Sequence, residues 1–575
     1  MREEEIRIKG VTLSDGIAIG TPYLFHSSQE EVPPQFPIAI GEVDQEIARY
    51  RKALFSSKED LESLQNSLEK EGSLDAVTII DAHIEMLKDP LMTTHVEEKI
   101  RQMKQNTEAV FRSVMTEYEN KFFAKTSDMF FQERLNDVLD LSKRILRNLD
   151  GKQKKPFFEI PDHSIIIAKI LTPTETASLQ ADRSFGFITE KGGTNSHTAL
   201  IARGKGIPFI SQVDLSIFER MKKQIIVDGA SGFVIVNPSL KTLSTYQKMK
   251  EKASSEVIAL QQETYLQAET KDGFSVNLFA NIGSACDVDL MHQFGGEGVG
   301  LFRTEYLFSG RDSLFSSEEE QSAIYSSVLK KAKGLPVVFR VFDVGADKYS
   351  HLFEELVAEG SPLTGVRGIR FLLQKRGLFK IQLRAIMRSA SFGDARILLP
   401  FVSDTRELLL TKHLIEEARA ELFREGVMVK ESIPLGAMIE LPAAVMMCDS
   451  ISRECDFLSI GTNDLIQYTL GIDRSSNKTE DPFHPIHPGI LRMVHRVLEV
   501  AKLELKPVTL CGEVASDPLL TSLLLGLGVT NFSCAPRFIP SIKKAIRSST
   551  YAEAQALAEQ ALKQPTAEAI ATLLS

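Results

Sequence analysis

Residues 185–210 read FGFITEKGGTNSHTALIARGKGIPFI. The first five are mostly apolar and include a threonine, which predicts a short buried strand, and the glycine pair at 192–193 ends it. Asn195 and Ser196 are both good N-cap residues, so a helix is expected to begin there and to stop at the glycines that follow. His197 would then lie in the first turn of this helix, beside a glycine-rich loop.

The start of that helix favours an anion, phosphate above all, because free backbone amides and the helix dipole meet there. The same field disfavours a protonated imidazole, so His197 is expected to be neutral and nucleophilic. A phosphoryl group on His197 would lie near the hydroxyls of Ser196 and Thr198. These residues alone leave open a histidine that only packs or caps the helix, and the second half of the chain bears on the choice.

Length and composition limit the possible functions. The chain has 575 residues, enough for about three or four domains, and a formal net charge of −10, which argues against a nucleic-acid partner. The chain has five cysteines, an odd number, and their spacing matches no metal-binding motif. We therefore expect them to be reduced thiols of a cytosolic protein. The sequence has no signal-like start and no apolar run long enough to insert into a membrane. These features predict a cytoplasmic enzyme.

Apolar periodicity divides the first half of the chain. Residues 6–26 and the stretch after about 152 resemble strands, whereas the residues between them repeat apolar side chains at helical spacing. We therefore expect a four-helix subdomain inserted into a small α/β domain whose sheet combines strands from both sides of the insert. The helices are expected at about 40–68, 75–102, 106–126 and 130–149.

The second half alternates eight strand candidates with helical stretches, which is the rhythm of a (β/α)8 TIM-type barrel. A polar helical stretch that precedes it predicts an exposed linker and a hinge. The expected division is an α/β domain at 1–30 plus 150–238, a helical subdomain at 31–149, a helical linker at 239–272 and the barrel at 273–575.

Catalytic groups of such barrels lie at the carboxyl ends of the strands. Polar residues occupy the predicted strand ends here: Arg303, Glu305, Arg340, Asp343, Glu440, Asn463, Asp464, Cys511 and Glu513. Glu440 and Asp464 suit Mg²⁺, which takes one or two carboxylates together with substrate oxygens. Arginines can neutralise a phosphate and a carboxylate, and Arg474 adds a third cation to Arg303 and Arg340. These groups predict a small, highly anionic substrate and phosphoryl transfer. The sequence shows no nucleotide-binding motif.

Five longer stretches of the sequence resemble one family, and they occur in that family's order. The chain resembles Enzyme I, the phosphoenolpyruvate-protein phosphotransferase of the bacterial sugar phosphotransferase system, over nearly its whole length. The stretches are GGTNSHTALIAR (192–203), GVGLFRTEYLF (298–308), IELPAA (439–444), SIGTNDLIQYTLGIDR (459–474) and LCGEVASD (510–517).

The resemblance implies a reaction and its partners. Phosphoenolpyruvate and Mg²⁺ would bind in the C-terminal barrel, and the phosphoryl group would move to a histidine on a swivelling α/β domain. From there it would pass to a histidine of the carrier protein HPr, which docks on the helical subdomain. The resemblance also implies a homodimer formed through the barrel.

The resemblance also assigns individual residues. His197 would be the phosphorylated histidine, and Cys511 would be the acid that protonates the enolpyruvate, although by itself Cys511 reads as a small buried thiol. Glu440 and Asp464 would be the Mg²⁺ ligands. The phosphoenolpyruvate ligands would be Arg303, Arg340, Arg367, Asn463, Asp464 and Arg474.

The sequence departs from the family at several positions, which bear on rate and carrier choice more than on the type of reaction. Thr194-Asn195 replaces the usual Arg-Thr pair and removes a cation near His197. Ala346 replaces a glycine in GADK (345–348), and SPLTGVRGIR (361–370) varies the usual pattern while keeping Arg367. DAHIEMLKDPLM (81–92) keeps the histidine of the helical insert but alters acidic positions around it.

Two other functions compete with this one. Pyruvate phosphate dikinase and phosphoenolpyruvate synthase share the swivelling and barrel domains, but they carry a further nucleotide-binding region and usually have alanine where Thr198 stands. A degenerate regulatory protein that binds carriers without turnover is the non-enzyme alternative. Retention of His197, both carboxylates, the arginines and Cys511 argues against it.

Overall fold

The structure is a computed structural model that describes residues 5–25, 35–71, 74–123, 129–149, 160–179, 185–193, 196–218, 224–262, 264–305, 317–343, 366–472 and 484–574. Four positions singled out in the sequence, Thr194, Asn195, Ala346 and Arg474, lie outside these residues. The chain forms two compact units, Met1–Glu256 and Val257–Ser575. No helix in the described part of the chain has the length and apolar character needed to cross a bilayer.

The first unit is built on a mixed sheet of eight strands in the order β1-β8-β7-β3-β4-β5-β6-β2. The strands β3, β4, β5 and β6 run parallel, and the other neighbours are antiparallel. The expectation that strands from both sides of the insert share one sheet is confirmed, since Ile6 of β1 pairs with Val236 of β8. The strands are β1 (Ile6–Lys9), β2 (Val11–Ser14), β3 (Ile17–Leu24), β4 (Ser164–Ala168), β5 (Gly186–Thr189), β6 (Phe209–Ser211), β7 (Ile225–Asp228) and β8 (Phe233–Val236).

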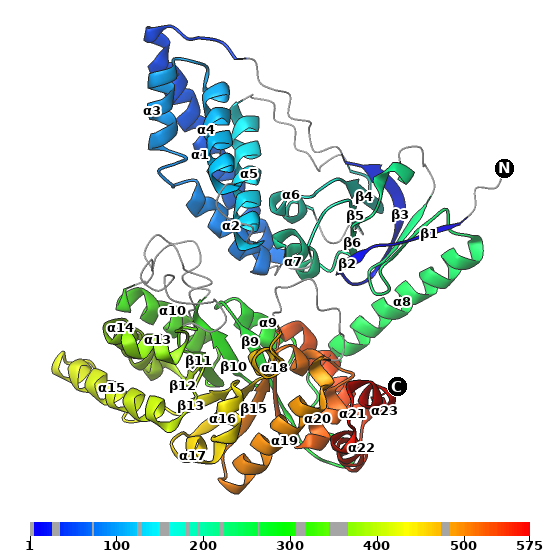
Figure 1. Cartoon of the computed structure of the whole chain (residues 1–575), viewed down its shortest axis with the longest axis vertical. Helices are drawn as coiled ribbons and strands as arrows, with labels where there is room; N and C mark the ends of the chain where they lie inside the picture. The colour runs from blue at the N-terminus through cyan, green and yellow to red at the C-terminus, as the bar shows by residue number, and fades with distance from the viewer. Residues whose placement is uncertain are drawn as a thin grey trace. The chain divides into compact units, whose positions relative to one another are not determined.

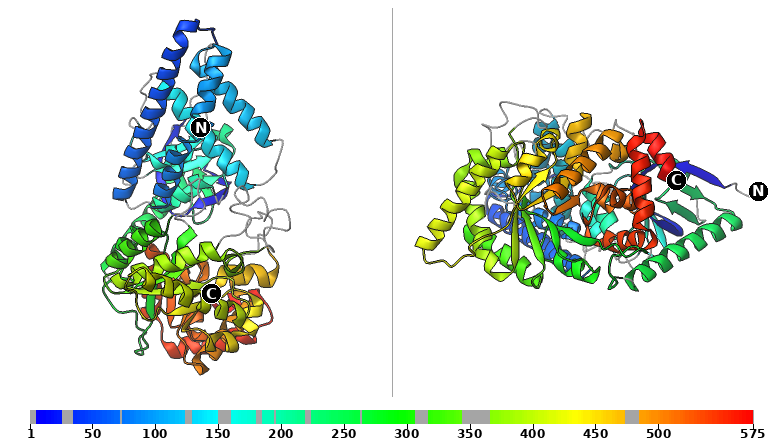
Figure 2. Two further views of the ribbon diagram at one scale, coloured as in Figure 1. Left: turned by 90° about the vertical axis from the view of Figure 1, so that its left-hand side faces the viewer. Right: turned by 90° about the horizontal axis from the view of Figure 1, so that it is seen from below.

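Among the described residues between β3 and β4, five α-helices form the predicted helical insert (Figures 1 and 2). The sequence predicts four, with a single helix over 75–102. The structure divides this stretch at a turn around Pro90, whose ring has no amide hydrogen and disfavours a helical residue before it. The turn is fastened by the hydroxyl of Tyr50, which donates to the carbonyl of Met92 at 2.6 Å. The helices are α1 (Val43–Glu71), α2 (Leu74–Met86), α3 (Thr94–Met103), α4 (Thr107–Phe123) and α5 (Met129–Leu149).

Two short helices of the α/β domain, α6 (Pro173–Ala177) and α7 (His197–Gly204), lie against the insert (Figure 1). Ala177 and Ile201 are buried in the same apolar core as the helices of the insert. Asp140 of α5 accepts hydrogen bonds from the backbone amide and the hydroxyl of Thr174, at 3.0 and 2.8 Å. The insert is therefore joined to the α/β domain by buried apolar and polar contacts. Most of the predicted linker is helix α8 (Leu240–Gln262).

The second unit is the predicted barrel: eight parallel strands close on themselves in chain order, with helices around them (Figure 1). The strands are β9 (Asn277–Ile282), β10 (Val299–Arg303), β11 (Pro336–Arg340), β12 (Asp394–Leu399), β13 (Leu435–Ile439), β14 (Phe457–Gly461), β15 (Val508–Cys511) and β16 (Asn531–Cys534). The helices are α9 (Asp287–Gln293), α10 (Glu318–Lys331), α13 (Ile369–Gln374), α14 (Arg376–Ser389), α15 (Thr405–Arg424), α16 (Pro442–Met446), α17 (Cys448–Arg453), α18 (Thr462–Leu470), α19 (Pro488–Leu503), α20 (Thr521–Leu527), α21 (Ile539–Ser548), α22 (Tyr551–Lys563) and α23 (Ala567–Leu574).

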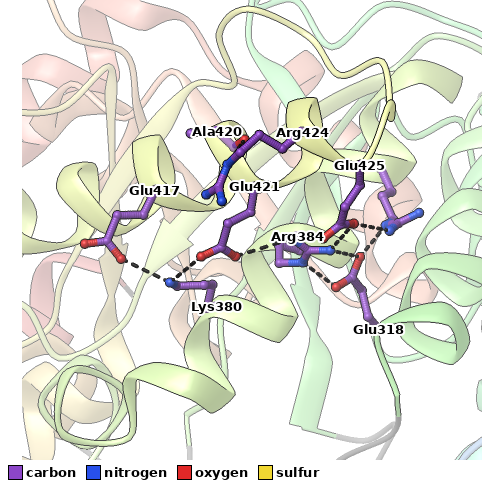
Figure 3. Close-up of polar contacts among 9 residues, drawn as sticks. Glu318, Lys380, Arg384, Glu417, Ala420, Glu421, Arg424 and Glu425 are labelled. Atoms are coloured by element: carbon purple, nitrogen blue, oxygen red, sulfur yellow. Dashed lines mark hydrogen bonds and ion pairs between the residues drawn. The ribbon is translucent and has the colours of Figure 1, made fainter.

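Three outer helices of the barrel, α10, α14 and α15, are linked by an ion-pair network (Figure 3). Arg384 of α14 contacts Glu318 at 2.5 Å, Glu425 at 2.6 Å and Glu421 at 3.4 Å. Lys380, one turn earlier, contacts Glu421 at 2.8 Å. Because the arginine is the most buried member and binds three carboxylates, it fixes the spacing of these helices on the outside of the barrel.

Candidate active site

His197 is the first residue of α7, as the sequence predicted. Ser196 is the N-cap: its side-chain oxygen accepts a hydrogen bond from the amide of Ala199 at 3.2 Å. The hydroxyl of Thr198 is buried and donates its proton in a hydrogen bond to the backbone carbonyl of Leu171 at 3.0 Å. One third of the His197 side chain is exposed.

A buried carboxylate that the sequence did not point to contacts His197. Nδ1 of His197 lies 3.1 Å from the carboxylate of Asp137, which belongs to α5 of the helical insert. Nε2 of His83, from α2, lies 3.3 Å from an oxygen of the same carboxylate. Burial alone would raise the pKa of Asp137, but the contacts with the two histidines outweigh it and lower the pKa below its ordinary value. No local pattern in the sequence reveals this contact, because Asp137 and His197 are 60 residues apart.

At the mouth of the barrel, Arg303 and Arg340 are neighbours at the carboxyl ends of β10 and β11. Arg340 is buried and contacts Glu305, and it lies 3.2 Å from Asp343. Burial works against the charge of Arg340, yet the two carboxylates raise its pKa above the ordinary value. The guanidinium is therefore charged and held in place at the end of its strand.

Arg367 lies between carboxylates of the same site. Its Nε and Nη2 donate to both oxygens of Asp343, at 2.9 and 3.0 Å, and its Nη1 lies 3.6 Å from Asp464. The guanidinium carbon lies 4.3 Å from the centre of the Phe401 ring, which supports the charged group from one face. These contacts fix Arg367 beside one of the two predicted metal ligands.

Glu440 follows β13 directly, and Asp464 lies in the first turn of α18 after β14. Glu440 is buried and accepts a hydrogen bond from the amide of Phe401 at 2.7 Å. Gly461 makes room for it, because a Cβ atom there would lie 2.7 Å from Glu440 Oε2. Burial, together with the charges of Asp464 and Asp343, raises the pKa of Glu440 to about 8.

This crowding of carboxylates fits a divalent cation, which would relieve their mutual repulsion. The described residues contain no group of three or more histidines, cysteines, aspartates and glutamates placed to hold a metal ion. Two carboxylates such as Glu440 and Asp464, completed by oxygens of water or substrate, suit Mg²⁺.

Cys511 ends β15 and lies in the apolar interior of the barrel, near Leu301 and Met438. Its thiol donates to the carbonyl of Ile460 at 3.2 Å and lies 3.5 Å from the hydroxyl of Ser459. Burial raises the pKa of the Cys511 thiol to about 11, so the sulfur keeps its proton at neutral pH.

Asn463 is held by the loop that follows β15. Its side-chain oxygen accepts from the amide of Glu513 at 2.9 Å, and its nitrogen lies 3.4 Å from the Glu513 carboxylate. The amide group of Asn463 is thereby oriented between β14 and β15.

Comparisons with known proteins agree with this arrangement. Three family models match the chain: the N-terminal domain of PEP-utilising enzymes over residues 9–134, their mobile domain over 160–232, and their PEP-binding domain over 258–551. The phosphoenolpyruvate-protein phosphotransferase of Staphylococcus carnosus is 37% identical over 579 residues, which cover 99% of this chain and 98% of that protein. The chain belongs to the phosphoenolpyruvate-protein phosphotransferase family.

Two further family members are similarly close. The phosphoenolpyruvate-protein phosphotransferase of Listeria monocytogenes is 36% identical over 578 residues and that of Geobacillus stearothermophilus 35% over 572, each covering 99% of this chain and 98% of the relative. The predicted resemblance to Enzyme I, the α/β and barrel fold and the assignment as an enzyme are thus confirmed. His197 lies within the part matched by the mobile domain, and the predicted barrel-mouth residues lie within the part matched by the PEP-binding domain.

Proposed function

We propose that this enzyme transfers the phosphoryl group of phosphoenolpyruvate to Nε2 of its own His197, and from there to a histidine of the carrier protein HPr, with release of pyruvate. The observation that carries the proposal is the gathering of arginines and carboxylates at the carboxyl ends of neighbouring barrel strands, around Arg340, Asp343, Arg367 and Asp464. Such a site suits a small substrate that carries both a phosphate and a carboxylate.

In the barrel, Arg303 and Arg340 would bind the anionic groups of phosphoenolpyruvate, with Arg474 as the third cation. Asn463 would donate to a substrate oxygen, and Arg367 would hold Asp464 and add positive charge nearby. Glu440 and Asp464 would hold Mg²⁺, which when bound would neutralise charge on the phosphoryl oxygens.

The chemistry divides between His197 and Cys511. The lone pair on Nε2 of His197 forms the N–P bond while the bond between phosphorus and the enol oxygen breaks, and the electron pair leaves with the enolate of pyruvate. The methylene carbon of that enolate then takes a proton, and the buried thiol of Cys511 would supply it. The thiolate left behind regains its proton from water before the next cycle.

The nucleophile and the substrate site belong to different units of the chain. His197 belongs to the first unit and the barrel mouth to the second. We infer that the first unit swivels about residues 238–272, so that His197 meets phosphoenolpyruvate and the carrier in turn. HPr would dock on residues 31–149, and two chains would pair through their barrels.

The direct test is to incubate the full chain with phosphoenolpyruvate labelled in the phosphate and with Mg²⁺, and to measure acid-labile phosphate on the protein. His197→Ala should abolish labelling while phosphoenolpyruvate binding, measured by calorimetry, is retained. His413→Ala, on an exposed stretch of α15, is the matched control and should label normally. Stoichiometric labelling of the His197 variant would reject the assignment, and an unlabelled wild-type chain that still binds HPr would favour the regulatory alternative.

A further inference from the structure

The side chain of Asp137 is buried between two histidines and comes from a different subdomain than the proposed nucleophile. It is 4% exposed, and its carboxylate lies 3.1 Å from Nδ1 of His197. On its other side lies His83, whose side chain is fully buried, with Nε2 at 3.3 Å from Oδ1. Neither ring nitrogen of His83 has a hydrogen bond to another group among the described residues. Asp137 is thus the polar group that His83 faces.

The contact determines where His197 carries its proton. An ionised carboxylate can only accept hydrogen bonds, so the nitrogen that it contacts must be the one that bears hydrogen. The lowered pKa of Asp137 keeps the carboxylate ionised at neutral pH. With the proton on Nδ1, the lone pair of the neutral imidazole is on Nε2, the other ring nitrogen.

The same contact acts on the product of the transfer. Once Nε2 carries the phosphoryl group and Nδ1 still carries its proton, the ring has cationic character. A carboxylate 3.1 Å from Nδ1 compensates this charge, and no proton has to leave the ring during the transfer.

We propose that Asp137, which also contacts His83, is a positioning residue. It fixes the tautomer and orientation of His197 so that Nε2 accepts the phosphoryl group. The effect on catalysis rests on the proposed function, whereas the effect on the tautomer does not. The helical insert therefore contributes to the chemistry at His197 as well as to carrier docking. Losing the negative charge at residue 137 should slow phosphoenzyme formation at least about tenfold, in the direction seen when the carboxylate behind a catalytic histidine is removed.

The test compares Asp137→Asn with Asp140→Asn in the full chain. Asp140 is one turn further along α5 and equally buried, but it binds Thr174 and not His197. Histidine-specific ¹⁵N labelling and NMR at a pH where the ring is neutral report the His197 tautomer, with His197→Ala used to assign the signal. The wild type and Asp140→Asn should show hydrogen on Nδ1, and Asp137→Asn should show a raised share of hydrogen on Nε2.

A wild-type His197 with hydrogen on Nε2 would overturn the proposal, whether or not the Asp137 variant folds. An unchanged tautomer together with wild-type labelling by phosphoenolpyruvate in a folded Asp137→Asn would overturn it as well. If the wild type shows the expected tautomer but is never labelled, the proposed function fails while the assignment of Asp137 stands. Asp137→Glu, which restores the charge, should recover part of the lost rate if the carboxylate acts on His197.

Discussion

Gly461→Ala should damage the proposed metal site while leaving the barrel folded. The φ of Gly461 is −89°, so alanine fits the backbone, but its Cβ would lie 2.7 Å from Glu440 Oε2 and 3.0 Å from Glu440 Cβ. To reach an ordinary separation of 3.4 Å the Glu440 carboxylate must move by about 0.7 Å, and this carboxylate also accepts the hydrogen bond of the Phe401 amide. Since a displacement of about 1 Å in a catalytic group can cost about a hundredfold in rate, we expect a loss of roughly ten- to a hundredfold. That loss corresponds to about 1.4–2.7 kcal/mol of activation free energy.

The assay is the initial rate of labelling from phosphoenolpyruvate at a series of Mg²⁺ concentrations. The loss should be largest at low Mg²⁺ and should shrink as the ion is raised, because the displaced carboxylate weakens binding of the metal. Gly377→Ala is the control, since a Cβ atom at Gly377, near the start of α14, meets nothing within 4 Å. Wild-type rates in a folded Gly461→Ala at every Mg²⁺ concentration would refute the role assigned to Glu440.

Two further predictions address other parts of the chain. Cys511→Ala should slow turnover of phosphoenolpyruvate far more than exchange of phosphate between phospho-HPr and His197, and equal losses in the two assays would make the cysteine structural. Glu5 accepts hydrogen bonds from Ser239 and Thr242 at the start of α8, and these lower its pKa to about 2. Its folded pKa lies below the ordinary value, so the stabilisation is present above about pH 4.5 and is lost as pH falls toward 2. Glu5→Gln should speed amide exchange in the first turn of α8 relative to the wild type at pH 7. The difference should shrink as pH falls from about 4.5 toward 2, and an undiminished difference across that range would contradict this assignment.

Much of the barrel could be predicted because its signals are local. Each strand is a short buried apolar run, and polar residues follow where the chain leaves the sheet. Asn463 and Asp464 show the limit of such reasoning, because the sequence places them at the end of a strand, whereas β14 ends at Gly461 and α18 begins at Thr462. The apolar residues end at Ile460 and a polar run follows from Gly461 to Asp464. Because barrel strands carry polar residues at their carboxyl ends, this pattern does not show whether Thr462 still belongs to the strand or begins a helix. In the structure the site residues Asn463 and Asp464 lie on a helix.

The contact between His197 and Asp137 could not be predicted from local pattern. Asp137 lies in an amphipathic helix among other charged residues, and nothing in its spacing distinguishes it from carboxylates that face solvent. What selects it is the packing of α5 and α2 against α7, which depends on the whole core of the insert. The turn at Pro90 is a different case, because proline carries a local signal that could have divided the predicted helix.

The placement of the helical insert also has a consequence for the order of folding. Strand β3 pairs with β4, yet Thr21 and its partner Ser164 are separated by the whole insert, and Ile6 of β1 must pair with Val236, some 230 residues further on. Closing such long loops is slow, whereas the contacts within the insert are more local. At about 5–20 residues per second, the ribosome needs between about 10 and 50 s to synthesise the partner of β1. The helices of the insert can fold during that interval, so within the first unit the sheet that carries His197 should be completed after the helical bundle.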